Sequence, residues 1–368
     1  MDSTFKIIIV VLLGLAVSLV GISRCNSAPA YQEASIEHGS LKRQGGTWVL
    51  RLSGSAPERG EAAGKLVGEQ IRWLLPRYLK ASLGREKLPA GAAGLLSKYE
   101  KVIPEDYLAQ LGALARSAGV DRDSLLAVNL APEMFVAKGC SCLALEAGRT
   151  SGGKVLLGRN LDWQAGEYLT SLGLLVIEKG SGHAFASVTW PGLVGVVSGM
   201  NERGLSVANL VVFGEGGAAG AGMPVLFILR KVLEQADDAA GAAGMIRDLR
   251  RSVCQNYALA DAESARVVES CPDSVRIRSP KDGVLAVANR RNEDKHSGAN
   301  SRYAKMIRAA SAGKLDLEKL EAVLSQVALG KMNVQAVIFE PQGRVLHLSI
   351  SEVPAASGTW TSLPLEFQ

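Results

Sequence analysis

The chain has 368 residues, of which 47% are hydrophobic, and a formal net charge of +5. This length and apolar content suffice to bury one large core or two modest ones. Charged residues are scattered without long runs of one sign, so the sequence carries no signature of nucleic-acid binding.

The N-terminus resembles a targeting segment. Lys6 precedes an apolar run from Ile7 to Ile22, and Ala28-Pro29-Ala30 offers a small-residue cleavage site. This pattern is typical of a secretory signal peptide over residues 1–30. An uncleaved membrane anchor over residues 7–22 is the alternative, because a spanning helix needs roughly 17 residues or more. Either interpretation predicts an extracytoplasmic protein, periplasmic or secreted.

Residues 31–139 are expected to form a mostly helical N-terminal segment. One strand is predicted over residues 47–52. From Arg59 onward, apolar residues recur every three or four positions, as a core-facing helix requires. Further helices are predicted near residues 91–102, 104–118 and 121–130.

A β-hairpin is predicted at residues 140–162. Cys140 opens an apolar run, a Gly152-Gly153 turn follows, and a second run delivers Arg159 and Asp162. A thiol, a guanidinium and a carboxylate would thus meet at one edge. A thiolate nucleophile needs a nearby cation and an oriented base. A lone cysteine is more often inert packing, and Arg159 with Asp162 alone would be a structural ion pair. The combination predicts a nucleophile site.

The rest of the chain alternates between runs of strands and pairs of helices. Strands are predicted near residues 172–179, 184–190, 193–199 and 204–211, and helices near 223–236 and 239–251. Strands then return near 255–261, 265–271, 274–278 and 284–289, followed by helices at 301–311 and 316–328 and strands at 334–340 and 344–350. This order predicts an α+β protein with helices on the outer faces of its sheets.

Two cysteines flank one of these predicted hairpins. With a turn at Ala262-Glu263, Cys254 lies opposite Cys271, with Cβ atoms about 4.5–5.5 Å apart. A disulfide wants roughly 3.5–4.5 Å, so a small shift would close it, and an oxidising compartment favours it. Two buried thiols in a strand pair are the alternative.

The string GCSCLALEAGRTSGGKVLLGRNLDW at residues 139–163 resembles a known nucleophile hairpin. It is that of the N-terminal-nucleophile (Ntn) hydrolases of the acyl-CoA:6-aminopenicillanate acyltransferase-like group, peptidase C45. Choloylglycine hydrolase, penicillin V acylase and acid ceramidase are more distant relatives. Residues 198–205 resemble the family's G-M-N-E-x-G-L strand and turn, and shorter signatures lie at 256–261, 288–289 and 300–303. The fold implied is a four-layer αββα sandwich.

The resemblance implies a cysteine amidohydrolase or acyltransferase that cuts its own chain between Gly139 and Cys140. Cleavage would separate the helical segment, residues 31–139, from a catalytic domain, residues 140–368. The freed α-amine, whose pKa is ordinarily about 7.7–8.0, would act as the base. Glycine before the cut leaves the attacked carbonyl sterically open and tolerates a distorted backbone.

The resemblance also assigns roles around the nucleophile Cys140. Arg159 would stabilise the thiolate and Asp162 would bind the α-amine. Cys142 departs from the family, which more often has serine, threonine or alanine there, and it alternates to the same face as Cys140. A shifted register would make Cys142 the nucleophile. The glycine before Cys140, the serine after it and its spacing to Arg159 favour Cys140.

Three further residues would complete the site by resemblance. Asn201 and Asn256 would supply oxyanion donors and contacts to the substrate amide, and Arg302 would support the network. From the residues alone, Asn201 also fits turn chemistry before Gly204, Asn256 a polar strand position, and Arg302 a solvated helix start. Loops near residues 164–172, 190–193 and 212–223 are expected to form the substrate pocket.

Other functional classes stay open. A Cys-His mechanism is disfavoured, because none of the four histidines lies in a recognisable catalytic setting. A non-catalytic envelope protein that keeps the fold for binding is one alternative, and a phospholipase B-like ester hydrolase is another. No metal-ligand or phosphate-cradling motif predicts a cofactor. The expected partner is an acylated small molecule or peptide amide, joined by an acyl-CoA donor if the enzyme is an acyltransferase.

Overall fold

The computed structural model describes residues 27–89, 91–134, 139–213, 222–296, 298–299 and 301–367. The alternative membrane anchor at residues 7–22 lies outside these ranges, as do residues 1–26 of the predicted signal peptide. Within them, no helix is both long and apolar enough to cross a membrane.

A ten-stranded sheet forms one half of the structure, in the order β1-β2-β3-β6-β7-β8-β9-β10-β11-β12. Its neighbours pair antiparallel except β3 and β6, which are parallel. The strands are β1 (Ala34–Ile36), β2 (Gly39–Gln44), β3 (Thr47–Ser53), β6 (Leu174–Lys179), β7 (Phe185–Thr189), β8 (Ser198–Asn201), β9 (Ser206–Val211), β10 (Gln255–Ala260), β11 (Ala265–Ser270) and β12 (Val275–Arg278).

A six-stranded antiparallel sheet packs against it, in the order β13-β4-β5-β14-β15-β16. The predicted hairpin at residues 140–162 is confirmed as β4 and β5, in a register that pairs Cys140 with Leu161 and Gly139 with Asp162. The strands are β4 (Gly139–Leu145), β5 (Leu156–Asp162), β13 (Val284–Val287), β14 (Asn333–Glu340), β15 (Val345–Ser349) and β16 (Thr361–Pro364).

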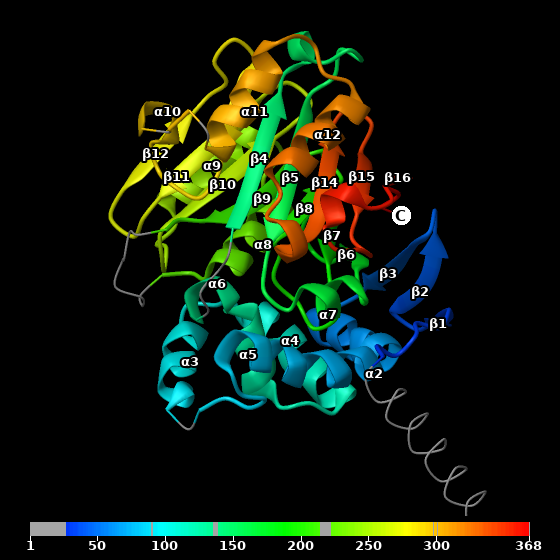
Figure 1. Cartoon of the computed structure of the whole chain (residues 1–368). Helices are drawn as coiled ribbons and strands as arrows, with labels where there is room; N and C mark the ends of the chain where they lie inside the picture. The colour runs from blue at the N-terminus through cyan, green and yellow to red at the C-terminus, as the bar shows by residue number, and fades with distance from the viewer. Residues whose placement is uncertain are drawn as a thin grey trace, which may run out of the picture.

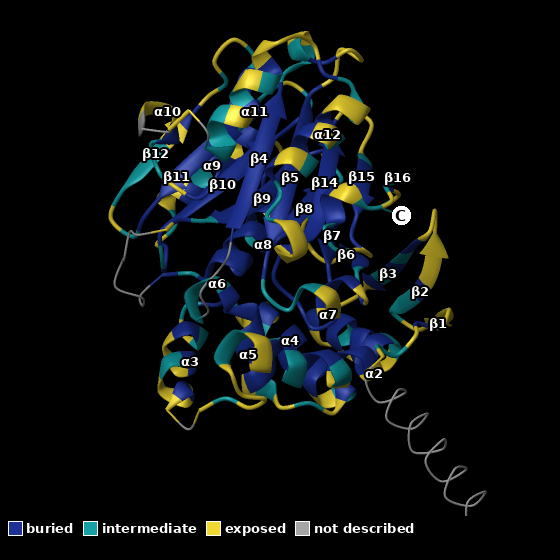
Figure 2. Cartoon of the chain, in the orientation of Figure 1, coloured by how far each residue is buried: buried dark blue, intermediate teal, exposed yellow. Residues whose placement is uncertain are grey.

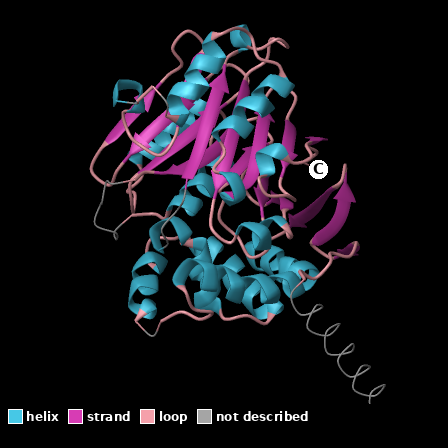
Figure 3. Cartoon of the chain, in the orientation of Figure 1, coloured by secondary structure: helices cyan, strands magenta, loops and turns pink. Residues whose placement is uncertain are grey.

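Helices cover the outer faces of both sheets. α8 (Val225–Gln235) and α9 (Ala239–Asp248) pack on the ten-stranded sheet, whereas α11 (Arg302–Ser311) and α12 (Leu317–Val327) pack on the six-stranded one. Figures 1 and 3 show the resulting order of layers, helix, sheet, sheet, helix. The predicted α+β class and αββα sandwich are therefore confirmed. α10 (Glu293–His296) precedes α11.

The N-terminal helices gather at one end of the sandwich (Figure 1). Helix α2 begins with a capping box between Ser55 and Glu58. A Cβ on Gly60 would lie 2.1 Å from the Gln110 carbonyl oxygen, so α2 and α4 can pack this closely only with glycine there. The helices are α2 (Ala56–Leu83), α3 (Ala92–Glu100), α4 (Glu105–Ala118), α5 (Arg122–Asn129), α6 (Ala131–Met134) and, from the later chain, α7 (Gly166–Thr170).

Two strand predictions need correction. The sequence predicted one strand before α2, but β1 and β2 extend the sheet outward from β3. The strand predicted at 193–199 begins only at Ser198, because Asn129 Oδ1 accepts the amides of Val194 and Gly195 in place of a strand partner.

The Cys254 and Cys271 hairpin has the predicted register. Gln255 pairs with Ser270 and Ala260 with Ala265, and the two cysteines form a disulfide. The structure therefore contains the predicted disulfide and not the alternative of two buried free thiols.

Burial is deepest where the two sheets meet, as Figure 2 shows. Every residue of β4 and β5 is buried. Cys140 and Cys142 belong to the hydrophobic core between the sheets. The candidate nucleophile is thus the second residue of a fully buried strand.

Candidate active site

Cys140 lies near the start of β4, and its side chain is on the face toward the ten-stranded sheet. Residues opposed in an antiparallel pair share a face, so Cys140, Cys142, Arg159 and Leu161 lie together. The Nε of Arg159 donates to Ser198 Oγ on β8 at 2.6 Å, which identifies this face as the inner one. Cys140 is 2% exposed.

Arg159 is a fully buried cation with unused hydrogen-bonding capacity. Its Nη1 donates to the Asn160 carbonyl oxygen at 2.8 Å, whereas Nη2 has no partner. No ion pair joins Arg159 to an acidic side chain in the described part of the chain. A buried charge without a counter-charge is costly. A thiolate on the same face would supply the missing negative charge.

Cys142 is poorly suited to be that thiolate. Burial raises the pKa of its thiol to about 12, even though the Arg159 charge acts to lower it. A thiol with this pKa stays protonated near neutral pH. The shifted register with Cys142 as nucleophile is therefore disfavoured.

The backbone amide of Cys140 is held by Asn289, a residue that the sequence marked only as part of a short signature. The Cys140 N–H donates to Asn289 Oδ1 at 2.9 Å. The same oxygen accepts from Arg302 Nη2, and Asn289 Nδ2 donates to the Val211 carbonyl oxygen at 2.8 Å. The nitrogen that cleavage would free thus already has a fixed partner.

Asp162 reaches Cys140 only through other residues. It opposes Gly139 and lies on the outer face, where Oδ2 accepts from Arg302 Nη1 at 3.0 Å. Its Oδ1 accepts from Asn333 Nδ2 at 3.0 Å. In the continuous chain, Asp162 is therefore connected to the Cys140 nitrogen indirectly. Asp162 accepts from Arg302, Arg302 donates to Asn289, and Asn289 accepts the Cys140 amide. The predicted supporting role of Arg302 fits this position.

Gly139 fits tightly beside this network. A Cβ at this position would lie 2.6 Å from Leu329 Cδ1 and 3.3 Å from Arg302 Nη2. Any larger residue would push against the guanidinium that holds Asn289.

The structure does not place Asn201 in the site. Its Nδ2 donates to the carbonyl oxygens of Leu233 and Ala236, both at 2.9 Å, and its Oδ1 accepts the amides of Arg203 and Leu205. These partners use its donors and acceptor in the turn after β8. The prediction of an oxyanion role for Asn201 is wrong here, because strand alternation turns it toward α8 and away from Arg159.

Asn256 lies beside the site and positions it. Its Nδ2 donates to the carbonyl oxygens of Ala288 and Arg290 at 3.1 and 3.0 Å. These two residues flank Asn289. The donor predicted for an oxyanion is thus already used to fix the backbone around Asn289.

Two cavities are lined by neighbours of Cys140, though not by Cys140 itself, and another lies apart. An open cleft of about 380 Å³ includes Phe213, Asn289 and Arg302 in its wall. A narrow apolar slot is lined by Leu161, Trp163 and Trp190. Trp190 and Phe213 lie in two of the loops expected to form the pocket, near residues 190–193 and 212–223, and residues 214–221 of the second loop lie outside the described ranges.

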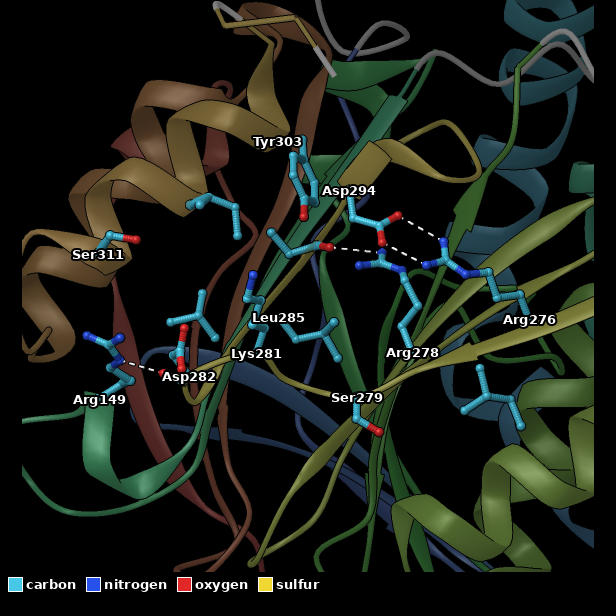
Figure 4. A pocket seen from close by; sticks show the side chains of 14 residues that line it. Arg149, Arg276, Arg278, Ser279, Lys281, Asp282, Leu285, Asp294, Tyr303 and Ser311 are labelled. Atoms are coloured by element: carbon cyan, nitrogen blue, oxygen red, sulfur yellow. Dashed lines mark hydrogen bonds and ion pairs between the residues drawn. The ribbon is translucent and has the colours of Figure 1, made fainter. Parts of the chain in front are cut away.

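The third cavity, of about 650 Å³, runs along β12 and β13 beneath α11 (Figure 4). Two of its arginines are paired with carboxylates: Arg276 contacts Asp294, in the cavity wall, at 2.7 Å, and Arg278 contacts Glu269, outside that wall, at 2.8 Å. No group of three or more metal-ligating side chains occurs in the described ranges.

A model of the family "Acyl-coenzyme A:6-aminopenicillanic acid acyl-transferase" matches residues 149–314. This range contains Arg159, Asp162, Asn289 and Arg302 but begins after Cys140. The match confirms the family resemblance drawn from the sequence. It leaves the catalytic cysteine as a prediction.

Two curated relatives are each 25% identical to the chain. An uncharacterised protein of Archaeoglobus fulgidus aligns over 312 residues, 74% of this chain and 51% of its own length. Protein dcd1B of Dictyostelium discoideum aligns over 276 residues, 66% of this chain and 55% of its own length. The chain thus spans about half the length of the curated relatives it matches.

Similar solved structures include a Caenorhabditis elegans ortholog of N-acylethanolamine-hydrolyzing acid amidase, with a TM-score of 0.47, 18% identity and coverage of 55% of this chain and 93% of that one. A conjugated bile acid hydrolase from Clostridium perfringens has a TM-score of 0.44, 14% identity and coverage of 61% and 92%. Penicillin V acylase from Agrobacterium tumefaciens has a TM-score of 0.44, 13% identity and coverage of 58% and 83%.

Proposed function

We propose that this chain is a member of the acyl-coenzyme A:6-aminopenicillanic acid acyl-transferase family of Ntn hydrolases, whose model matches residues 149–314, and that it uses Cys140 to cleave a linear amide C–N bond. The observation that carries the proposal is the environment of Cys140. Its backbone nitrogen is held by Asn289 and Arg302, and its side chain shares a buried face with the uncompensated charge of Arg159.

Self-cleavage would come first. Cys140 Sγ attacks the Gly139 carbonyl carbon, and the peptide C–N bond breaks as the thiol proton passes to the departing nitrogen. Water then hydrolyses the thioester, which leaves a carboxylate on Gly139 and a free α-amine on Cys140. The contact between the Cys140 nitrogen and Asn289 Oδ1, at 2.9 Å, suits both the amide and the amine.

Amide turnover would reuse the same atoms. The α-amine takes the thiol proton, the thiolate attacks the substrate carbonyl, and the amine product leaves with that proton. Arg159 stabilises the negative charge on sulfur or on the carbonyl oxygen, since its Nη2 is an unpartnered donor on this face. Water then hydrolyses the acyl-enzyme thioester and completes the reaction. The enzyme would be an acyltransferase if a second amine attacked this thioester in place of water, or if an acyl-CoA supplied its acyl group.

We place the reaction outside the cytoplasm. The Cys254–Cys271 disulfide supports an oxidising compartment, as does the signal-like pattern at residues 1–30. Thiol counting on denatured, unreduced protein tests this arrangement in the native host. Alkylation of both Cys254 and Cys271 without reductant would contradict it.

Covalent trapping tests the nucleophile. An acyl-enzyme is captured by acid quench during turnover of an amide substrate and then mapped by peptide mass spectrometry. We expect the acyl group on Cys140 in the wild type and in Cys142→Ser, and none in Cys140→Ala. Acylation of Cys142 in the wild type would transfer the role to that residue.

A further inference from the structure

The chain around Asn289 is held by the end of β9 and the start of β10. Asn256, the second residue of β10, donates through Nδ2 to the two carbonyl oxygens that flank Asn289, at 3.1 and 3.0 Å. At the end of β9, the Asn289 side chain donates to the Val211 carbonyl oxygen at 2.8 Å, and the Phe213 amide donates to the Asn289 carbonyl oxygen at 2.9 Å. Because Asn289 Oδ1 accepts the Cys140 amide, the position of the bond to be cut depends on these two strand ends.

The Cys254–Cys271 disulfide lies at the same strand ends. Cys254 directly precedes β10, and Cys271 directly follows β11. Both cysteines are buried in a small cluster with Val212, the residue between the two on β9 and its extension that bind Asn289. The disulfide therefore closes the hairpin at the end that supports Asn289.

The disulfide also contacts the segment after Asn289 directly. Arg291, two positions further along the chain, donates from Nη1 to Cys271 Sγ at 2.9 Å. The bond to Cys254 fixes that sulfur, whereas the side chain of a free thiol can change its rotamer. Reduction would therefore leave this contact without a fixed acceptor atom.

The two ends of the β10–β11 hairpin are held by different means. At the turn, Asp261 Oδ1 accepts the amides of Glu263 and Ser264, both at 2.8 Å. The other end is closed covalently by Cys254 and Cys271. Strand ends open more readily than strand centres, so the reduced hairpin is expected to fray at the end that supports Asn289.

We propose that the Cys254–Cys271 disulfide positions Asn289 for self-cleavage, so that the cut between Gly139 and Cys140 follows formation of this bond. This inference rests on the proposed function of Cys140. The oxidant is a disulfide-bearing molecule such as oxidised glutathione. One protein thiolate attacks its disulfide and releases a first thiol, and the second protein thiolate displaces the other. The precursor therefore stays uncut in a reducing cytoplasm and is cut after it reaches an oxidising compartment.

The size of the effect follows from the geometry. Misplacing a reacting group by about 1 Å can cost about 10²-fold in rate. Asn256 and Val211 still hold Asn289 after reduction, so the displacement is partial. We expect self-cleavage to slow by about tenfold without the disulfide.

The order of the two events tests the proposal. Full-length wild type and Cys254→Ala/Cys271→Ala are made in a reducing cytoplasm and purified with reductant, which is then exchanged for oxidised glutathione. Intact mass follows the loss of the thiol hydrogens and the fragment that begins at Cys140, and molecules carrying bound glutathione are counted apart. We expect wild type to form the disulfide first and then to be cut. The double variant, and wild type kept in reductant, should be cut about tenfold more slowly per folded molecule.

Asn201→Ala is the matched control, because it destabilises the turn after β8 without contacting Asn289. It should be cut at the wild-type rate per folded molecule. If it slowed cleavage as much as the double variant, loss of stability alone would explain the effect and the inference would be overturned. Equal rates in wild type and the double variant, or fragments that precede the disulfide, would also overturn it and leave the Cys140 mechanism intact. Wild type that forms the disulfide and is never cut would contradict the proposed function itself.

Discussion

Two buried clusters of charge in this molecule are completed in different ways. In the first, Glu178 on β6 accepts from Arg59, Arg230 and Gln110, and Arg230 also pairs with Glu234. In the second, Arg159 shares a sheet face with Cys140, has an unpartnered Nη2 and contacts no carboxylate of the described residues. The first cluster joins the N-terminal helices to the sandwich and is electrically satisfied, as a structural network must be. The second is left incomplete at the candidate nucleophile, where a reaction would supply the missing charge.

The largest expected effect concerns the satisfied cluster. Among the described residues, Glu178→Gln removes the only carboxylate that contacts Arg59 and one of two that contact Arg230, both arginines being buried. Breaking a buried ion pair costs about 3–5 kcal/mol. Urea denaturation should show this loss, with the helical segment detaching first once residues 31–139 are cut from the sandwich. Unchanged stability would mean that the network does not hold the segment. Glu318→Gln, at an exposed position on α12, is the control.

The incomplete cluster should respond in the opposite way. Arg159→Met keeps bulk but removes an uncompensated buried charge, so stability should be unchanged or raised. Turnover should fall by about 10²–10³-fold, the usual cost of removing a charge-stabilising donor. Paired measurements of kcat and the urea midpoint check this. A variant that unfolds, with full activity in its folded fraction, would make Arg159 a structural residue.

Glu133 offers a pH-dependent test of how the N-terminal segment is held to the sandwich. It is part of the N-terminal segment, accepts from the Val225 amide and Ser252 Oγ, and burial raises its pKa to about 7. A carboxyl whose folded pKa exceeds its unfolded pKa, about 4.3, destabilises the fold as pH rises between those values. Stability should therefore fall by a few kcal/mol from pH 4.5 to 7 in the wild type. Glu133→Gln should lack this component, and identical pH profiles would contradict the assignment.

The smallest expected difference is between substitutions of two asparagines, one in a turn and one at the site. Asn201→Ala should lower stability by about 1–3 kcal/mol, because it leaves turn amides and carbonyls without partners, while the folded protein still matures. Asn289→Ala should slow self-cleavage, since it releases the Cys140 nitrogen and Arg302. Time courses of fragment formation beside urea titrations distinguish them. Normal maturation of Asn289→Ala would remove that residue from the site.

Local pattern accounts for the parts of this structure that were predicted from sequence. The Gly152-Gly153 turn defines the hairpin that carries Cys140 and Arg159. The turn at Ala262-Glu263 defines the register that brings Cys254 opposite Cys271. By contrast, β1 is short and exposed, and pairing with β2 rather than an apolar pattern makes it a strand.

Asn289 and Asn201 show what local sequence patterns could not predict. The contact between Cys140 and Asn289 joins residues 149 positions apart, on a strand start and the chain after β13, and no spacing in the sequence signals it. The motif around Asn201 was identified, but a motif does not say which face of the sheet a residue takes. Ser198, three positions earlier on β8, faces Arg159, so alternation turns Asn201 to the other side.

Intact-mass analysis of the purified protein tests the central claim most directly. The wild type and Cys142→Ser should each yield a catalytic fragment that begins at Cys140, together with a helical fragment that ends at Gly139. Cys140→Ala should stay one chain with the same fold. A wild type that remains a single chain while it hydrolyses amides would contradict the account, as would cleavage that persists in Cys140→Ala.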